Sequence, residues 1–261
     1  MECRNMLLPD KVCVIVGAAS LRSIGYAAAE LFATHGAKII AVDVLMNDTI
    51  ADDIKASIES KVGRNADVIG IRCDIADSAD CRQLFREAVA RYGTVDCLVN
   101  SAAIVKAQSM LTIEEADYDR IMNVNLKGAF NLCKSALEVF TERKSGTIVN
   151  VASVAAQRGG GLVGGAHYAA SKGGVISLTR TIAREFGPLG IRANVVCPSM
   201  TETAMLDGMS AERQKEIETS IPLQRAGKPV EIAGACLFLA SDLSGYVTGA
   251  TIDVNGGSHI H

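Results

Sequence analysis

The sequence predicts an α/β fold, in which a doubly wound parallel sheet of about seven strands carries helices on both faces. Short apolar runs alternate with helical segments along the whole 261-residue chain, a pattern typical of parallel strands joined by helical crossovers. Residues 1–261 contain no linker, internal repeat or low-complexity segment. The hydrophobic content of 49% is enough for a sizeable core, so we expect a single domain.

The first strand–helix–strand unit is the clearest. Residues 11–16 form an apolar run that ends at Gly17, which indicates a buried parallel strand. Residues 24–35 have helical periodicity and are followed by Gly36, the usual residue after a helix. Residues 37–44 form a second strand. This unit is the mononucleotide-binding half of a Rossmann-type sheet.

The same alternation continues to the end of the chain. Apolar periodicity and the glycine or Gly-Pro stops predict the remaining elements. Helices are expected over residues 50–62, 78–92, 113–143 (as two helices), 167–186, 210–219 and 229–240, and strands over residues 67–73, 95–100, 146–151, 191–196 and 250–254.

Composition excludes several classes of partner. The net charge is −3, Trp is absent and aromatic residues make up 4%, so we expect no nucleic-acid binding. No apolar run approaches ~20 residues, and the first eight residues do not resemble a secretory signal, so no membrane contact is expected. We therefore predict a cytoplasmic protein that acts on a small molecule.

The cysteines and histidines do not predict a metal site. No Cys-x-x-Cys pair occurs, and most of the cysteines lie in apolar runs, which is typical of small core residues in a reducing compartment. His259 and His261 are weak evidence for a metal by themselves, so none is expected. The eight cysteines are Cys3, Cys13, Cys73, Cys81, Cys97, Cys133, Cys197 and Cys236.

The loop from Gly17 to Gly25 predicts a dinucleotide site. Its small residues lie between a strand and a helix, where backbone can approach a pyrophosphate at the helix N-terminus. Asp43 closes the next strand and is placed to accept hydrogen bonds from a ribose. Its charge would repel a 2′-phosphate, which favours NAD over NADP. Arg22 within the loop leaves NADP open, and a simple turn-starting carboxylate is the alternative for Asp43.

Tyr168 and Lys172 predict acid–base chemistry. A spacing of four residues puts both side chains on one face of a helix. An ammonium near a phenol lowers the phenol's pKa from its usual value near ~10, which would let the tyrosine exchange a proton with a substrate oxygen. An ordinary helix start with a solvated lysine is the alternative.

With these motifs in their order, the chain resembles the classical short-chain dehydrogenases/reductases over nearly its whole length. Tyr168-x-x-x-Lys172 matches the catalytic pair, Ser153 the serine after the fifth strand, and Asn125 the asparagine of the fourth helical region. Asp74 resembles the acid that contacts adenine, and residues 198–203 resemble the segment that reaches the nicotinamide. The resemblance implies cofactor contacts from Gly17, Ser23, Ile24, Asp43, Asp74, Ile75, Asn100, Ala102, Tyr168, Lys172, Pro198, Thr201 and Thr203.

Three features depart from the family pattern. Gly17 and Gly25 are eight residues apart instead of six, which is similar to the loop of enoyl-acyl-carrier-protein reductases. The Tyr–Lys spacing nevertheless favours classical alcohol/ketone chemistry. Residues 100–103 read Asn-Ser-Ala-Ala where the family has Asn-Asn-Ala-Gly. Ser153 precedes Tyr168 by fifteen residues, two more than usual, and the extra length falls in the glycine-rich segment 154–166.

The resemblance also implies a mechanism. Tyr168, as phenolate, takes the alcohol proton while hydride leaves for C4 of the nicotinamide, and Ser153 hydrogen-bonds the substrate oxygen. Lys172 lowers the pKa of Tyr168 and hydrogen-bonds the nicotinamide ribose, and Asn125 holds a water that links Lys172 to solvent. The simpler alternatives are that Ser153 caps a turn and that Asn125 binds backbone.

The substrate is less defined. Its pocket is expected from residues 104–110, 154–166 and 203–209. Arg158 is the one cation of the glycine-rich segment; it either binds a substrate anion or faces solvent. Four apolar side chains are expected either to cover a nonpolar substrate or to pack in the core: Met200, Met205, Leu206 and Met209.

We predict an NAD-dependent oxidoreductase for a secondary alcohol or ketone, such as a polyol, a sugar or sugar acid, or a cyclic alcohol. One alternative is a 3-oxoacyl-carrier-protein-type ketoreductase using NADPH, which Asp43 disfavours. Another is a non-catalytic dinucleotide sensor, which a complete proton relay disfavours. The resemblance also implies a homotetramer whose interface uses helices within residues 113–143 and 167–186.

Overall fold

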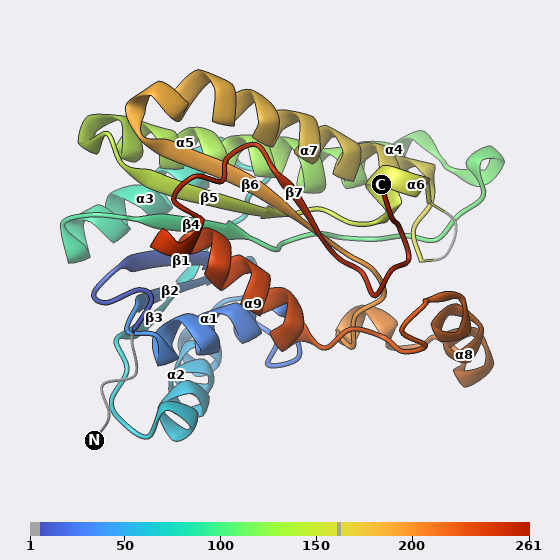
Figure 1. The fold of residues 1–261 in the computed structure, drawn as a ribbon, viewed down its shortest axis with the longest axis horizontal. Coiled ribbons are helices and arrows are strands. Elements are labelled where there is room, and N and C mark those ends of the chain that lie inside the picture. The colour runs from blue at the N-terminus through green and yellow to red at the C-terminus, as the bar shows by residue number, and fades with distance from the viewer. Residues whose placement is uncertain (1–5, 161–162) are drawn as a thin grey trace.

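The centre of the molecule is a parallel sheet (Figure 1). The computed structural model describes residues 6–160 and 163–261, and within them seven parallel strands, the number that the sequence predicts, pair in the order β3-β2-β1-β4-β5-β6-β7. The strands are β1 (Val12–Val16), β2 (Lys38–Asp43), β3 (Val68–Arg72), β4 (Cys97–Asn100), β5 (Gly146–Val151), β6 (Ile191–Pro198) and β7 (Thr251–Val254).

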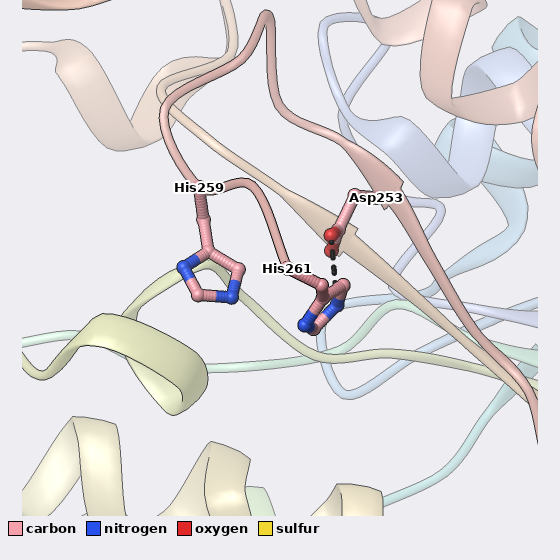
Figure 2. A group of neighbouring side chains, drawn as sticks. All are labelled: Asp253, His259 and His261. Carbon is pink, nitrogen blue, oxygen red and sulfur yellow. Dashed lines mark ion pairs between the residues drawn. The ribbon is translucent and has the colours of Figure 1, made fainter.

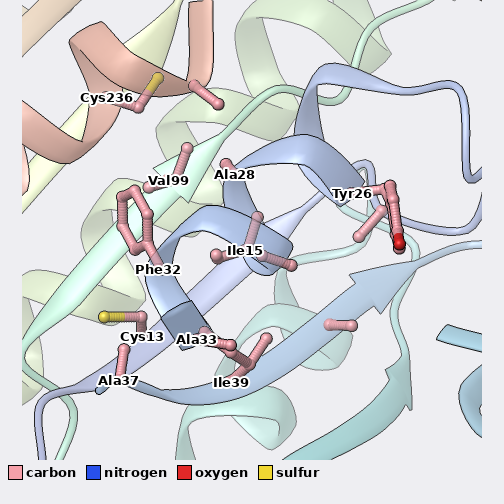
Figure 3. Close-up of a cluster of buried hydrophobic side chains, with 14 of the residues drawn as sticks. Cys13, Ile15, Tyr26, Ala28, Phe32, Ala33, Ala37, Ile39, Val99 and Cys236 are labelled. Atoms are coloured by element: carbon pink, nitrogen blue, oxygen red, sulfur yellow. The ribbon is translucent and has the colours of Figure 1, made fainter. Parts of the chain in front are cut away.

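Helices cover both faces of the sheet, because alternate residues of each strand point to opposite sides. Ile15 of β1 joins the cluster under the first layer of helices, whereas Val14 and Val16 join the cluster under the second. Figure 3 shows the first cluster, in which Phe32 lies among strand and helix side chains. The first layer holds α1 (Ile24–Thr34), α2 (Asp48–Val62) and α9 (Pro229–Ala240), and the second α3 (Ser78–Tyr92), α5 (Gly128–Arg143) and α7 (Ala166–Phe186).

Several elements differ in detail from the sequence prediction. Residues 113–143 form α4 (Glu115–Met122), a π-helical turn (Asn123–Lys127) and α5, so the two expected helices are joined by a widened turn. A four-residue helix, α6 (Ala155–Arg158), lies inside the glycine-rich segment, and α8 spans Ala211–Ser220. Four short 3₁₀ turns are η1 (Met110–Thr112), η3 (Gly187–Leu189), η4 (Ala204–Leu206) and η5 (Asp242–Ser244).

The cysteines behave as core residues where the structure describes them. Seven are buried and free, and Cys3 lies outside the described residues. Burial raises the pKa of the thiols of Cys133, Cys197 and Cys236 to about 12, so these groups are protonated at neutral pH. Among the helices of residues 6–160 and 163–261, none has the length and apolar character needed to cross a membrane.

Candidate active site

The predicted site residues follow the carboxyl ends of neighbouring strands. The strand order reverses between β1 and β4, and such switch points open the crevice in which α/β sheets bind ligands. One residue comes from the end of each of five strands: Gly17 after β1, Asp43 of β2, Asp74 after β3, Asn100 of β4 and Pro198 of β6. Residues that are far apart in the sequence therefore share one edge of the sheet.

The loop after β1 is packed too closely for larger residues. Gly17 has a φ of +86°, and a Cβ there would lie 2.9 Å from the backbone nitrogen of Ala102. A Cβ on Gly25 would lie 2.4 Å from the Gly17 oxygen. Ser23, which replaces the family's middle glycine, caps α1 by accepting a 2.9 Å hydrogen bond from the Tyr26 nitrogen. The first turn of α1 has no acidic residue, so its N-terminus suits an anion such as a pyrophosphate.

Asp43 lies against this loop. Its Oδ2 accepts a 3.2 Å hydrogen bond from the nitrogen of Ala19, and its Oδ1 accepts a 3.1 Å bond from the nitrogen of Leu45. The carboxylate thus starts a turn and also adds negative charge beside the loop. Arg22 points to another partner, because its guanidinium forms a bidentate ion pair with Asp207, at 2.9 and 3.1 Å.

Asp74 and Ile75, which are predicted to contact the cofactor, make contacts within the protein. Asp74 accepts a 2.9 Å hydrogen bond from the Ala76 nitrogen through Oδ1. The Ile75 side chain is buried beneath α5, where a Cβ on Gly128 would lie 2.6 Å from it. Ile75 therefore contributes its side chain to the core, and its carbonyl accepts a 2.9 Å hydrogen bond from Nδ2 of Asn131.

Asn100 belongs to a buried amide network that the sequence analysis missed. Its Nδ2 donates to the Asn150 oxygen at 3.3 Å, and its Oδ1 accepts from the Ala102 nitrogen at 3.3 Å. Asn150 in turn donates to the Thr179 hydroxyl of α7 at 2.9 Å. Asn100 and Asn150 face each other in the register of β4 and β5. A polar residue inside an otherwise apolar central strand is the signal that points to Asn150.

A cleft at this edge brings together three of the four predicted catalytic side chains. Its empty volume, counted out to open solvent, is about 920 Å³. The predicted residues that line it are Ile24, Ser153, Arg158, Tyr168, Lys172, Pro198, Thr201 and Thr203. The predicted residues that do not line it are Gly17, Ser23, Asp43, Asp74, Ile75, Asn100, Ala102 and Asn125.

Lys172 is almost completely buried, with 3% exposure. Its Nζ donates a 2.7 Å hydrogen bond to the carbonyl of Val151 at the end of β5. Burial disfavours the charged form and lowers the pKa of Lys172 to about 8.

The predicted lowering of the tyrosine pKa is wrong for this structure. Burial raises the pKa of Tyr168 above its ordinary value, and the hydrogen bond with Ser153 only partly opposes this effect. Desolvation of the phenolate dominates, and the Lys172 ammonium is directed at the Val151 carbonyl. Spacing along a helix indicates which side chains share a face, but it does not reveal how deeply they are buried.

Asn125 connects two segments beside the cleft. It is 2% exposed; its Oδ1 accepts from the Ile104 nitrogen at 2.9 Å, and its Nδ2 donates to the Ile104 oxygen at 2.9 Å. The same Nδ2 donates to the Ser171 hydroxyl at 3.1 Å, and that hydroxyl donates to the Tyr168 carbonyl at 2.8 Å. Asn125 therefore binds backbone, the simpler of the two interpretations, and its water-binding role stays a prediction. Ser171, three residues after Tyr168, was missed.

Ser153 and Gly164 lie on either side of the tyrosine. Ser153 accepts a 3.1 Å hydrogen bond from the Ala155 nitrogen, so it caps the turn into α6 and also hydrogen-bonds Tyr168. A Cβ on Gly164 would lie 2.5 Å from Cδ1 of the Tyr168 ring. The glycine-rich segment thus packs its backbone directly against the ring, a contact that the sequence analysis did not identify.

The outer wall of the cleft draws on the three expected segments. Val105, Val163, Met205 and Leu206 line it, and Met200 both lines it and belongs to a small apolar cluster. Met209 packs against that cluster and does not line the cleft. Arg158 lines the rim, where its Nη1 donates a 3.1 Å hydrogen bond to the Ser258 carbonyl.

Comparisons with known proteins agree with this arrangement. A family model described as "Enoyl-(Acyl carrier protein) reductase" matches residues 17–259. An uncharacterized short-chain type dehydrogenase/reductase, y4mP of Sinorhizobium fredii, is 45% identical over 258 residues, which cover 98% of this chain and 100% of the relative. The 3-oxoacyl-[acyl-carrier-protein] reductase FabG of Thermotoga maritima is 38% identical over 252 residues, which cover 97% of this chain and 99% of FabG.

A solved structure gives the same result at the level of the fold. The crystal structure of gox2181 aligns with a TM-score of 0.89 and 29% sequence identity, and the alignment covers 99% of each chain. The family match spans the loop after β1, the catalytic cleft and β7. The chain therefore belongs to the short-chain dehydrogenase/reductase family and is an oxidoreductase of that family.

Proposed function

We propose that the protein transfers a hydride between NAD(H) and a secondary alcohol or ketone. The observation that carries this proposal is that Ser153, Tyr168 and Lys172 line one cleft, beside a close-packed loop that suits a pyrophosphate. Their two hydroxyls and one ammonium are the groups needed to hold a substrate oxygen and move its proton. The nicotinamide, when bound, supplies or accepts the hydride.

The protonation states of Tyr168 and Lys172 favour carbonyl reduction. Tyr168 is a neutral phenol, because burial raises its pKa. It can therefore donate its proton to the carbonyl oxygen as the carbonyl carbon gains hydride. Ser153 hydrogen-bonds the same oxygen and orients it toward the phenol. Lys172 stabilises the resulting phenolate when charged, and oxidation of the alcohol runs through the same steps in reverse.

The cofactor is proposed to be NAD. Asp43 adds negative charge beside the loop, which disfavours a 2′-phosphate. Arg22, the cation that left NADP open, is bound to Asp207. Both observations favour NAD, whose adenosine ribose has a free 2′-hydroxyl.

The wall of the cleft favours an apolar cyclic alcohol among the predicted substrates. Val105, Val163, Met205 and Leu206 offer no hydrogen bonds to the many hydroxyls of a polyol or sugar. Arg158, the candidate for a sugar-acid carboxylate, already donates to Ser258. These contacts support a substrate with an apolar face toward this wall, and the polar residues of the lining are Ser101, Ser153, Arg158, Tyr168, Lys172, Ser199, Thr201 and Thr203.

A 3-oxoacyl-carrier-protein-type ketoreductase is the second candidate, favoured by the similarity to FabG. Such an activity would use NADPH and an acyl thioester, and Asp43 weighs against NADPH. A dinucleotide sensor has no use for the Ser153–Tyr168–Lys172 constellation.

The homotetramer stays a prediction. Phe130 of α5 is half exposed and lies near residues of α7, and these are the two helices expected at the tetramer interface.

An assay across cofactors and substrates separates these functions. Absorbance at ~340 nm should change with NAD and cyclic secondary alcohols, and much less with NADP or with open-chain polyols, because the cleft is apolar and its ribose side is acidic. A rate confined to NADPH with a 3-oxoacyl thioester would establish the ketoreductase instead. No rate with any pair, together with measurable NADH binding, would indicate the sensor.

Asp43→Asn should shift the cofactor preference. Removing the negative charge at nearly constant size relieves the repulsion of a 2′-phosphate. The ratio of kcat/KM for NAD to that for NADP should therefore fall roughly tenfold or more, which corresponds to ~1.4 kcal/mol or more. Asp48→Asn, at the exposed start of α2, is the matched control and should leave the ratio unchanged. An unaltered ratio in Asp43→Asn would contradict the assignment.

Carbonyl reduction should weaken as the pH rises above 8. The ammonium of Lys172 is present below its pKa of about 8 and lost above it, whereas Tyr168 stays protonated because burial raises its pKa. Since kcat/KM for NADH reports ionisations of the free enzyme, its profile from pH ~6.5 to ~9.5 should bend downward near pH ~8.

Lys172→Arg provides the control for this profile. Arginine keeps its charge across the whole range, so any residual activity should lack the bend. The same bend in Lys172→Arg, or a flat profile in the unmodified protein, would show that another group titrates.

A further inference from the structure

Three potential metal ligands converge beside the last strand. Asp253 of β7, His259 and His261 each offer one ligand atom, and these atoms all lie within 4.8 Å of one another. Figure 2 shows both imidazoles on the segment that returns past β7. Asp253 Oδ2 and His261 Nε2 are 3.1 Å apart, and the two histidine rings meet edge to face with centroids 4.8 Å apart.

A structured turn holds His259 in this position. Asn255, which is buried, accepts a 2.9 Å hydrogen bond from the Gly257 nitrogen and donates a 3.1 Å bond to the His259 carbonyl. Gly256 and Gly257 have φ values of +64° and +88°, which favour glycine. The chain therefore reverses within a few residues, so the histidines return to β7 at little further cost in conformational entropy.

A neighbouring amide orients the carboxylate. Gln157 of α6 donates a 2.9 Å hydrogen bond from Nε2 to Oδ1 of Asp253, and the same Nε2 lies 3.3 Å from Nε2 of His261. Oδ2 of Asp253 is left to face His261. Such outer contacts are typical of metal sites, because they fix the ligand's orientation. The Oε1 atom of Gln157 is buried and has no hydrogen-bond partner among the described residues.

We propose that Asp253, His259 and His261 form a binding site for a divalent first-row transition ion such as Zn²⁺. Two imidazole nitrogens and a carboxylate oxygen suit zinc, whose bonds to them are ~2.0–2.2 Å, so tetrahedral ligand atoms lie roughly 3.3 Å apart. The Asp253–His261 pair already has this spacing. The His259 nitrogen, now within 4.8 Å of the other two ligand atoms, has to move closer to them, and a fourth position stays open to water. Mg²⁺ and Ca²⁺, which prefer oxygen ligands, fit poorly.

The bound ion would stabilise one wall of the catalytic cleft. Arg158, the last residue of α6, lines the cleft and donates a hydrogen bond to the carbonyl of Ser258. Ser258 lies in the sequence between Asp253 and His259. Ser258 also shares a 2.9 Å hydrogen bond with the hydroxyl of Ser199. None of the three proposed ligands lines the cleft, so the ion has a structural role and takes no part in proton or hydride transfer.

Calorimetric titration of the untagged full chain, stripped with a chelator, tests the site directly. ZnCl₂ should bind with a stoichiometry of about one ion per chain and raise the Tm, whereas MgCl₂ should do neither. His259→Ala and His261→Ala should each weaken Zn²⁺ binding at least tenfold. Gln157→Leu should weaken it 10–100-fold and keep the stoichiometry, because it removes only an outer contact.

His35→Ala changes a histidine at the end of α1 and serves as the matched control, with unaltered Zn²⁺ affinity expected. The His261 side chain is 65% exposed, so its removal should not prevent folding. The proposal is overturned if the unmodified chain fails to bind Zn²⁺. It is equally overturned if the His259→Ala/His261→Ala double variant binds Zn²⁺ as tightly as the unmodified chain.

Discussion

The burial of Lys172 is the constraint on which the active site depends. An ammonium removed from water needs a partner, and Lys172 finds one in the Val151 carbonyl at the end of β5. This bond requires the start of α7 to lie close to the sheet edge. Gly174 permits close packing of α7 on the π-helical turn, because a Cβ there would lie 2.8 Å from the Leu126 side chain. The same burial lowers the pKa of Lys172 and raises that of Tyr168, which leaves a protonated phenol beside a partly charged lysine near pH 8.

Close packing at the carboxyl ends of the strands fixes the rest of the site. Gly17 and Gly164 allow backbone to approach within contact distance of the residues after β4 and of the Tyr168 ring. Buried amides then join segments that share no secondary structure: Asn100 links β4 to β5, and Asn125 links the segment after β4 to α7. Because each amide both donates and accepts, these junctions leave few buried polar groups unsatisfied.

The sequence was sufficient for the family and for most of the elements, and it placed Ser153, Tyr168 and Lys172 at the cleft that they line. Residues 146–151 and 229–240 have the predicted bounds, because a glycine or proline marks where each element begins. The π-helical turn at 123–127 was not predictable, since helical periodicity runs through it. The direction of the Tyr168 pKa shift depends on burial, which spacing does not encode. The Gln157–Asp253 contact joins residues 96 positions apart, so it emerges only from the fold.

We propose that the Tyr168 hydroxyl carries the proton. Tyr168→Phe removes only that hydroxyl and keeps the ring that packs against Gly164, so we would compare its steady-state turnover with that of the unmodified enzyme. We expect a loss of ~10²–10⁴-fold, the usual contribution of a positioned acid or base, with unchanged NADH affinity and Tm. Turnover within tenfold of the unmodified enzyme would contradict it.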